Sequence, residues 1–361
     1  MIRRLFVDNF GCLVNFEAEL MPLQLLLGPN GGGKSTVFEA IRTIQRVLGG
    51  SRLHDVLPST TRTRWQLAPV QKFEITLVLD DEQLVYSLKV EHDDAQRRSR
   101  ILHERLEAAQ TPLFEFVEGE VRLYRDDGSE GPHYSFDWTQ SALAFVSPRH
   151  DNVRLTRFRD ALDSILVVAP TPPKMEDLVN RESKKLAARM ENTVAWYHDV
   201  SQDQGVAIRV VDAIREIIPG FSHFKFETAG EMIGLLVVRE DNRTYRWCEL
   251  SDGERMLCAL YMLVSVHERH RILCVDEPAN YVGLSEIGPW LDTVTDLCDA
   301  GLLQMIVISH HPIWIDRNAV TRGLWLEREP GTPTRATKVR ADVGAPMPVS
   351  VLAERGWIGL D

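Results

Sequence analysis

The sequence has no apolar run of the roughly 18 residues or more that a membrane-spanning helix needs. Its first residues, MIRRLFVDNFG, lack the long apolar segment of a secretory signal peptide. Cysteine is scarce and widely spaced, with no CxxC pair: Cys12, Cys248, Cys258, Cys274 and Cys298. Since most of these cysteines lie in apolar stretches, we expect reduced core thiols in a cytoplasmic protein without a membrane partner.

The sequence also lacks an excess of positive charge. Its formal net charge is −11, so any binding of DNA or RNA must come from a local basic surface. One candidate is SPRHDNVRLTRFRD (147–160), which contains Arg149, Arg154, Arg157 and Arg159. The other is QRRSR (96–100). An ordinary solvated face or turn is the alternative for both segments.

Hydrophobic patterning in the first half predicts strands, one helix and an antiparallel meander. Residues 2–7 and 23–27 have strand patterns, and LQLLL (23–27) is apolar enough for a buried parallel strand. A helical period begins at Ser35, and Gly49-Gly50 end it. The alternation of apolar and polar residues then predicts antiparallel strands at 73–79, 84–90 and 113–125.

The second half changes character after VVAPTPP (167–173). Residues 175–218 are charged with a helical period, and short strands are expected within 222–248. A regular alternation follows: a helix from Ser251, a strand at 272–275, a helix at 285–299 and a strand at 303–309. This alternation predicts parallel strands that join the sheet begun by residues 23–27.

GPNGGGKST (28–36) fits the phosphate-loop pattern G-x-x-x-x-G-K-[ST], between an apolar strand and an amphipathic helix. Its glycines let backbone N–H groups point at phosphate oxygens, and the helix N-terminus adds about half a positive charge. Lys34 is expected to reach the β- and γ-phosphates, and the Ser35 hydroxyl to bind Mg²⁺. The expected ATP-binding residues are Gly28, Pro29, Asn30, Gly31, Gly32, Gly33, Lys34, Ser35 and Thr36. A glycine-rich turn without a ligand is the alternative.

Two acidic residues follow a buried strand in ILCVDEP (272–278). The carboxyl ends of parallel strands are where open α/β sheets bind ligands. Asp276 is therefore expected to complete the Mg²⁺ shell, and Glu277 to hold and deprotonate a water in line with the γ-phosphate. The alternative is a pair of acids in the turn before Pro278.

Histidines follow another buried strand in VISHHP (307–312). His310 is expected to hydrogen-bond the γ-phosphate, with His311 as the second choice and a turn-capping role as the alternative. HERH (267–270) is one residue short of the H-E-x-x-H zinc spacing and is interpreted as structural.

ELSDGER (249–255) contains the capping box S-x-x-E, formed by Ser251 and Glu254, at the start of a helix. A capped helix start with a glycine at its tip also suits a γ-phosphate that arrives from outside the chain. The carboxylate of Asp252 would repel phosphate unless it faces away.

In this order, GPNGGGKST, LSDGER, CVDEP and SHHP resemble the ABC-type ATPases of the SMC/RecF/OLD group, over residues 1–48 and 248–315. The resemblance implies an α/β fold: a P-loop ATPase head with a mainly parallel core sheet, an antiparallel β lobe and a helical lobe. Residues 1–50 and 221–345 would form the nucleotide-binding core. Residues 51–145 would form the β lobe, 146–220 the helical lobe and 346–361 a C-terminal tail.

Carried over by position, the resemblance implies roles for single residues. Lys34 and Ser35 would contact phosphate and Mg²⁺, Asp276 would bind Mg²⁺, Glu277 would be the catalytic base and His310 the switch histidine. Ser251, Asp252, Gly253 and Glu254 would form the signature that covers ATP on a second subunit. Asn280 would begin the segment that crosses to that subunit.

The sequence departs from these relatives at three places. Asp252 stands where transporters usually have glycine, and YVGLSE replaces the GLHP found in many relatives after the asparagine. The Q-loop glutamine has three candidates, Gln66, Gln71 and Gln140.

The expected function is Mg²⁺-dependent ATP hydrolysis by a head-to-tail homodimer that regulates a partner acting on DNA or RNA, in DNA repair or antiviral defence. The stretch 175–218 is too short for SMC coiled-coil arms. There is also no acidic cluster of the TOPRIM type, so we expect any nuclease to be a separate polypeptide. A non-hydrolysing ATP-dependent clamp, a transporter nucleotide-binding subunit and a monomeric P-loop kinase are the alternatives.

Overall fold

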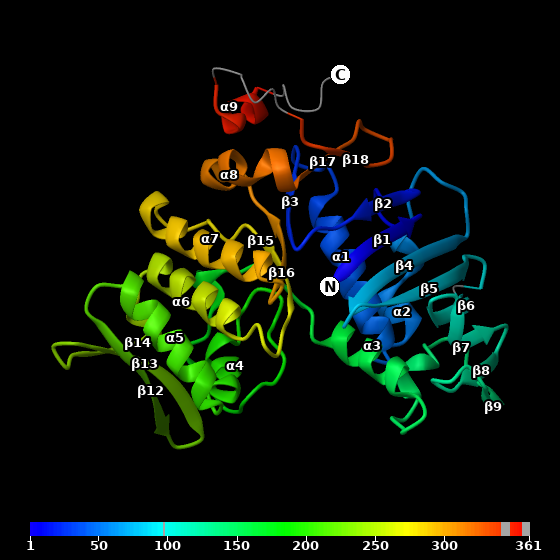
Figure 1. Cartoon of the computed structure of the whole chain (residues 1–361), viewed down its shortest axis with the longest axis horizontal. Coiled ribbons are helices and arrows are strands. Elements are labelled where there is room, and N and C mark those ends of the chain that lie inside the picture. Colours follow the sequence, from blue (N-terminus) through cyan, green and yellow to red (C-terminus); the bar gives the residue numbers. More distant parts are fainter. Residues whose placement is uncertain (97, 341–346, 356–361) are drawn as a thin grey trace.

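The computed structural model describes residues 1–96, 98–340 and 347–355, whose strands form three sheets (Figure 1). The largest is an antiparallel sheet of eight strands. Its strands lie in the order β2 (Phe16–Glu19), β1 (Ile2–Asp8), β4 (Val70–Leu79), β5 (Glu82–Asp93), β6 (Arg98–Ala108), β7 (Thr111–Val117), β8 (Glu120–Tyr124) and β9 (Glu130–Ser135). The expected antiparallel meander is therefore present, and two N-terminal strands extend it.

The second sheet has six strands and provides the core of the α/β fold. Its order is β10 (Leu166–Val168), β15 (Ile272–Asp276), β16 (Gln304–Ile308), β3 (Leu23–Leu27), β17 (Gly323–Glu327) and β18 (Arg335–Lys338). All neighbours are parallel except β17 and β18. Helix α1 (Lys34–Leu48) follows β3, α7 (Leu284–Asp299) connects β15 to β16, and α8 (Pro312–Arg322) connects β16 to β17. The predicted parallel sheet is thus confirmed.

The remaining lobe combines helices with a small sheet, at the left of Figure 1. Its elements are β11 (Leu178–Val179), α4 (Thr193–Val200), α5 (Gln204–Ile217), β12 (Phe221–Ala229), β13 (Met232–Arg239), β14 (Thr244–Arg246) and α6 (Asp252–Ser265). The other helices are α2 (Leu53–Val56), α3 (Val153–Asp163) and α9 (Val349–Glu354). Short 3-10 helices lie at Ser59–Thr61, Leu143–Phe145, Pro172–Lys174 and Trp247–Glu249.

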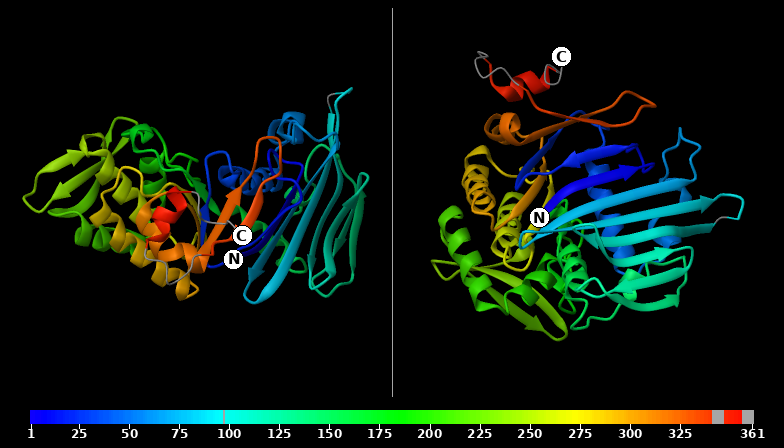
Figure 2. Two further views of the ribbon diagram at one scale, coloured as in Figure 1. Left: turned by 90° about the horizontal axis from the view of Figure 1, so that it is seen from above. Right: turned by 45° about the vertical axis from the view of Figure 1, so that its right-hand side comes forward.

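The central strands of the parallel sheet face two hydrophobic cores. In β3, Leu25 belongs to the core shared with α4–α8, while Leu26 belongs to the core shared with α1 and the antiparallel sheet. The same alternation occurs in β16, where Val307 and Ile306 face opposite cores. Each of these strands is buried on both faces, which explains the nearly continuous apolar character of LQLLL. Figure 2 shows the two lobes on either side of this sheet.

The prediction of a helical stretch over 175–218 is wrong for its first part. Residues 175–192 contain only the short strand β11, and the helices are α4 and α5. The backbone of this segment bonds to β13 and to the loop that follows β10 instead. Ala169 N donates to Ala188 O at 2.7 Å, and Leu178 pairs with Gly234 of β13. These distant backbone partners outweigh the local helical period.

The predicted strand at 113–125 is two strands, β7 and β8. A turn at Glu118 and Gly119, with φ values of 49° and 92°, separates them. β6 was not predicted, because its charged start overlaps the basic segment 96–100. Strands from outside 51–145 also enter the antiparallel sheet, and β10 from within 146–220 enters the core sheet.

Of the expected C-terminal tail, residues 346 and 356–361 lie outside the described residues. The described part contains α9, which packs on α8. Ser350 N of α9 donates to Asp316 Oδ1 of α8 at 2.8 Å. The five cysteines are free thiols: Cys248 is exposed and the other four are buried. Among the described helices, none has both the length and the apolar character of a membrane span.

Candidate functional site

The phosphate loop lies between β3 and α1, directly against the end of β17. A Cβ at Gly28, whose φ is +133°, would come within 1.9 Å of Leu326 O. Only glycine allows this approach, since any side chain would overlap a backbone carbonyl. Gly33 caps α1 with a φ of 102° and no side-chain hydrogen bond. The N–H groups of the first turn therefore remain available to an anion.

Lys34 is the first residue of α1, and its side chain folds back over the phosphate loop. It is 7% exposed, and Nζ donates to Gly28 O at 2.6 Å and Pro29 O at 3.0 Å. Burial lowers the pKa of the ammonium, and the nearby Glu277 and Asp276 oppose that shift. A buried cation thus lies near two carboxylates in the site.

Ser35 and Asp276 meet where the carboxyl end of β15 approaches α1. Ser35 Oγ donates to Asp276 Oδ2 at 3.2 Å. Burial raises the pKa of Asp276, while the Ser35 hydroxyl and Lys34 act to lower it. A hydroxyl and a carboxylate are oxygen ligands of the kind that Mg²⁺ prefers, so this pair fits the ion.

Glu277 and His310 lie side by side at the ends of β15 and β16. Glu277 has a φ of 52°, a backbone conformation that non-glycine residues rarely adopt and that is often found at functional sites. Its Oε1 lies 3.7 Å from His310 Nε2, and its Oε2 accepts from His310 N at 3.4 Å. Burial raises the pKa of Glu277 and lowers that of His310. The arrangement suits a proton acceptor next to a neutral imidazole.

These side chains surround one cavity of about 390 Å³. It is lined by Cys12, Asn30, Gly31, Gly32, Gly33, Lys34, Ser35, Thr36, Asp276, Glu277, Ile308, His310 and Arg328. His310 is part of the wall and His311 is not, which favours His310 as the expected phosphate contact. Gly28 and Pro29 lie behind the wall and accept from Lys34.

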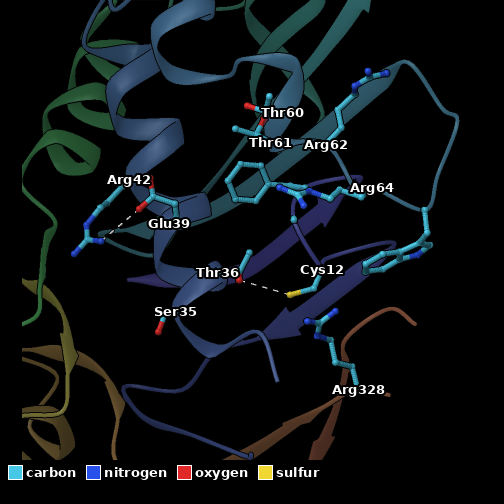
Figure 3. Close-up of a pocket in the computed structure, with 13 residues that line it drawn as sticks. Cys12, Ser35, Thr36, Glu39, Arg42, Thr60, Thr61, Arg62, Arg64 and Arg328 are labelled. Atoms are coloured by element: carbon cyan, nitrogen blue, oxygen red, sulfur yellow. Dashed lines mark hydrogen bonds and ion pairs between the residues drawn. The ribbon is translucent and has the colours of Figure 1, made fainter. Parts of the chain in front are cut away.

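A second cavity of about 710 Å³ adjoins the first. Figure 3 shows Arg328 extending from the end of β17 toward Cys12 and the start of α1. Both cavities share Cys12, Ser35, Thr36 and Arg328 in their walls. Sequence reasoning missed Arg328, because no motif marks it and nearly 300 residues separate it from the phosphate loop.

The expected signature lies at the start of α6, outside both cavities. Glu254 N donates to Ser251 Oγ at 3.2 Å and Ser251 N to Glu254 Oε2 at 3.1 Å, so the predicted capping box is present. Asp252 forms an ion pair of 2.5 Å with Arg255, which offsets its charge. A Cβ at Gly253 would lie 2.9 Å from Tyr281 O. Within one chain, the structure does not bring these residues to the phosphate loop.

Asn280 follows Glu277 in the segment between β15 and α7, where its N–H donates to Glu277 O at 3.2 Å. It lines neither of these cavities, and neither do the three candidate glutamines. Gln71 is buried and donates to Asn9 O, and Gln140 donates to Gly50 O. The connection from β10 into the helical lobe, APTPPKM (169–175), contains no glutamine.

The arginines of segment 147–160 are used within the fold. Arg149 pairs with Asp151, Arg154 with Glu82 and Arg157 with Asp80. Arg159 donates to the carbonyls of residues 143, 144 and 146. These contacts favour the structural alternative over a nucleic-acid surface.

The segment 96–100 is also engaged in part. Arg100 pairs with Glu91 at 2.6 Å, and Arg97 lies outside the described residues. In HERH, His267 and His270 each use Nδ1 on a backbone carbonyl, of Val264 and Ser164. Within the described residues, no group of three or more His, Cys, Asp or Glu side chains is arranged to hold a metal ion.

A family model described as "AAA domain, putative AbiEii toxin, Type IV TA system" matches residues 25–316. An OLD nuclease of Thermus scotoductus is 46% identical over 59 residues, which are 16% of this chain and 10% of that protein. The chromosome partition protein Smc of Halothermothrix orenii is 33% identical over 82 residues, 21% of this chain and 6% of that protein. Each match therefore spans a tenth or less of the relative's length.

Two solved SMC heads have a similar fold. The SMC head bound to the C-winged helix domain of ScpA has a TM-score of 0.57 and 14% identity, over 93% of this chain and 98% of that chain. The SMC head domain from Thermotoga maritima has a TM-score of 0.51 and 13% identity, over 94% and 99%. The fold is that of an SMC-like ATPase head.

Proposed function

The chain belongs to the family described as "AAA domain, putative AbiEii toxin, Type IV TA system", and on that premise we propose that it is an ATP-hydrolysing homodimer. It is a P-loop ATPase head of the SMC/OLD-like group by sequence pattern and fold. The finer proposal is that each chain binds Mg-ATP, pairs head to tail with a second copy and hydrolyses the nucleotide.

One observation carries the proposal. Lys34, Ser35, Asp276, Glu277 and His310 come from three separated segments and line a single cavity. Each side chain has a chemical task in phosphoryl transfer, in which positioning and charge stabilisation supply most of the catalysis. A glycine-rich turn without a ligand would not require two acids and a histidine at the same place.

The chemistry follows from these side chains. Lys34 and the N–H groups of α1 bind the phosphates, and Ser35 and Asp276 would hold Mg²⁺, which offsets phosphate charge when bound. Glu277 accepts a proton from a water in line with the γ-phosphate; its raised pKa, caused by burial, makes it a better base. His310 hydrogen-bonds the γ-phosphate.

Dimerisation is supported by the position of the α6 start. Ser251 is exposed, and the signature residues line neither cavity of their own chain. A second copy related by two-fold symmetry would bring its Ser251 and Gly253 over the bound ATP, giving two equivalent sites. Loss of the γ-phosphate on hydrolysis would then loosen the interface.

We further propose that this cycle regulates a separate partner, such as a nuclease, that acts on DNA or RNA in DNA repair or antiviral defence. The support is the names of relatives, an OLD nuclease and a chromosome partition protein. It is an inference by analogy, since no nucleic-acid site stands out among the described residues.

The decisive experiment measures molar mass by light scattering, with and without Mg-ATP. Wild type is compared with Glu277→Gln, which keeps the shape of the side chain and removes the base. We expect Glu277→Gln to bind ATP and accumulate as a dimer, and Lys34→Ala to remain monomeric. A Glu277→Gln protein that binds ATP but stays monomeric would rule out the head-to-tail dimer.

ATP turnover of the same proteins tests the alternative of a non-hydrolysing clamp. The proposed base predicts a turnover in wild type well above that in Glu277→Gln. Equal rates in the two proteins, together with an ATP-dependent dimer, would favour the clamp.

A further inference from the structure

The β17–β18 hairpin forms a wall of the nucleotide site that no sequence motif marks. Besides the contact of Leu326 O with Gly28, Thr334 N donates to Cys12 O at 3.0 Å. Thr334 Oγ1 lies 2.6 Å from the place of a Cβ at Gly33. That hydroxyl is buried and has no hydrogen-bond partner among the described residues. The hairpin therefore packs against both ends of the phosphate loop, at Gly28 and at Gly33.

Arg328 begins the loop of this hairpin and links the phosphate loop to an aromatic side chain. Its Nε donates to Gly31 O at 2.7 Å, and its Cζ lies 5.9 Å from the ring centroid of Trp65. Among the described residues, no carboxylate lies within ion-pair distance of this guanidinium. Arg328 therefore keeps donors and an uncompensated charge for a ligand.

The two cavities that Arg328 joins differ in chemistry. The smaller one contains Lys34, Asp276 and Glu277, which suit a polyphosphate and its cation. The larger one adds the aromatic side chains of Phe10 and Trp65 to a polar wall. That wall includes Glu39, Arg42, Thr60, Thr61, Arg62 and Arg64. The volume of this cavity, about 710 Å³, is in the usual range for pockets that enclose organic ligands.

We propose that Arg328 and Trp65 bind the nucleoside end of the nucleotide whose phosphates Lys34 holds. This inference rests on the proposed binding of ATP. Trp65 is 40% exposed, so its ring can stack on a base. The planar guanidinium of Arg328 donates where the ribose joins the phosphates. The chain therefore prefers a nucleoside triphosphate to a bare triphosphate.

The test compares the affinities for ATP and for inorganic tripolyphosphate by calorimetry, with Mg²⁺ in excess. Because base stacking on an aromatic ring is strong, Trp65→Ala and Arg328→Ala should each weaken ATP binding about tenfold. Tripolyphosphate has no nucleoside, so its affinity should stay unchanged. Trp65→Phe keeps a ring and should retain most of the ATP affinity.

Arg335→Ala is the matched control, because Arg335 is an exposed arginine of the same hairpin and lines neither cavity. It should bind both ligands like wild type. Arg328→Lys keeps the charge but not the planar donors, and should not restore full ATP affinity. Unchanged melting temperatures without nucleotide would show that all variants fold.

Three results would overturn the inference. The first is that Arg328→Ala binds ATP as wild type does. The second is that Trp65→Ala and Arg328→Ala each lose affinity for ATP and tripolyphosphate equally, which would mean that the two side chains only support the phosphate loop. The third is that wild type fails to bind ATP, which would overturn the proposed function as well. Binding that depends on Lys34 but not on Arg328 or Trp65 would leave the proposed function intact.

Discussion

The starts of α1 and α6 are two glycine-containing helix N-termini that the sequence assigns to the same ATP, and they are built differently. α1 begins after Gly33 and has no side-chain cap. α6 begins after Ser251, and its capping box satisfies the N–H groups of Ser251 and Glu254. The first end is therefore open to an anion bound within its own chain, whereas the second is partly satisfied by its own side chains before any ligand arrives.

The comparison shows how a site shared between two chains can be stable in each chain alone. At α1, Lys34 bonds to carbonyls of its own loop, so the buried cation is satisfied within the chain. At α6, the ion pair with Arg255 offsets the negative charge of Asp252, which would otherwise repel phosphate. Both ends can thus be kept folded by local contacts.

The largest expected effect is a loss of ATP affinity when the α1 start is changed. Lys34→Ala should lower the affinity for ATP about 100-fold or more, because it removes a buried charged donor from the site. Calorimetry measures this directly. Lys184→Ala, which removes an exposed lysine far from the motif in sequence, is the control and should bind ATP normally.

A pair of glycine variants tests the packing of the open end. Gly28→Ala should destabilise the protein by about 3 kcal/mol or more, because its Cβ would overlap Leu326 O. Gly31→Ala has no atom within 4 Å of the new Cβ and should cost only about 1–2 kcal/mol, for its φ of +79°. Chemical denaturation gives both values; equal costs would contradict the close approach to β17.

Gly253→Ala tests the capped end. The added Cβ would lie 2.9 Å from Tyr281 O, so the α6 start must shift slightly. We expect ATP to bind this variant as it binds wild type, while dimerisation of Gly253→Ala in the Glu277→Gln background weakens about tenfold, or about 1.4 kcal/mol. Light scattering across a concentration series measures the change. A loss of ATP binding would show that the two ends are not independent.

Ser251→Ala should cost about 1 kcal/mol of folding stability, the usual value of an N-cap. The α1 start has no such cap to lose, because its Ser35 bonds to Asp276 instead of to its own helix. Thermal melts without nucleotide measure the loss for Ser251→Ala. An unchanged melting temperature would contradict the capping role of Ser251.

The smallest expected effect is a change in folding stability with pH. Burial acts to raise the pKa of Glu254, but the bonds from Arg239 and Ser251 outweigh it and leave the pKa lowered. A carboxylate with a lowered pKa stabilises the fold above its unfolded pKa, and that stabilisation is lost as the pH falls through the folded pKa. Glu254→Gln should therefore be less stable than wild type at pH 7, and the difference should shrink below about pH 4.

Much of this arrangement could be predicted from sequence because it is local. The phosphate loop, the strand before it and the helix after it lie within 26 consecutive residues, from Leu23 to Leu48. The ion pair of Asp252 and Arg255 was not predicted, although residues three apart on a helix are neighbours.

What could not be predicted depends on distant partners. Residues 175–192 have a helical period, yet their backbone bonds to β13 and to the loop that follows β10. β1 looked like any half-buried strand, and only the fold shows that it joins β4 rather than β3. Arg328 is one arginine among many in the sequence, and its place at the phosphate loop depends on how β17 packs beside β3.

The alternation of buried side chains along β3 and β16 has a consequence for unfolding. These strands are the common boundary of both hydrophobic cores, so neither core can lose its packing without exposing one face of the same sheet to water. The β lobe and the helical lobe are therefore expected to melt together, as one cooperative unit, although each has its own sheet.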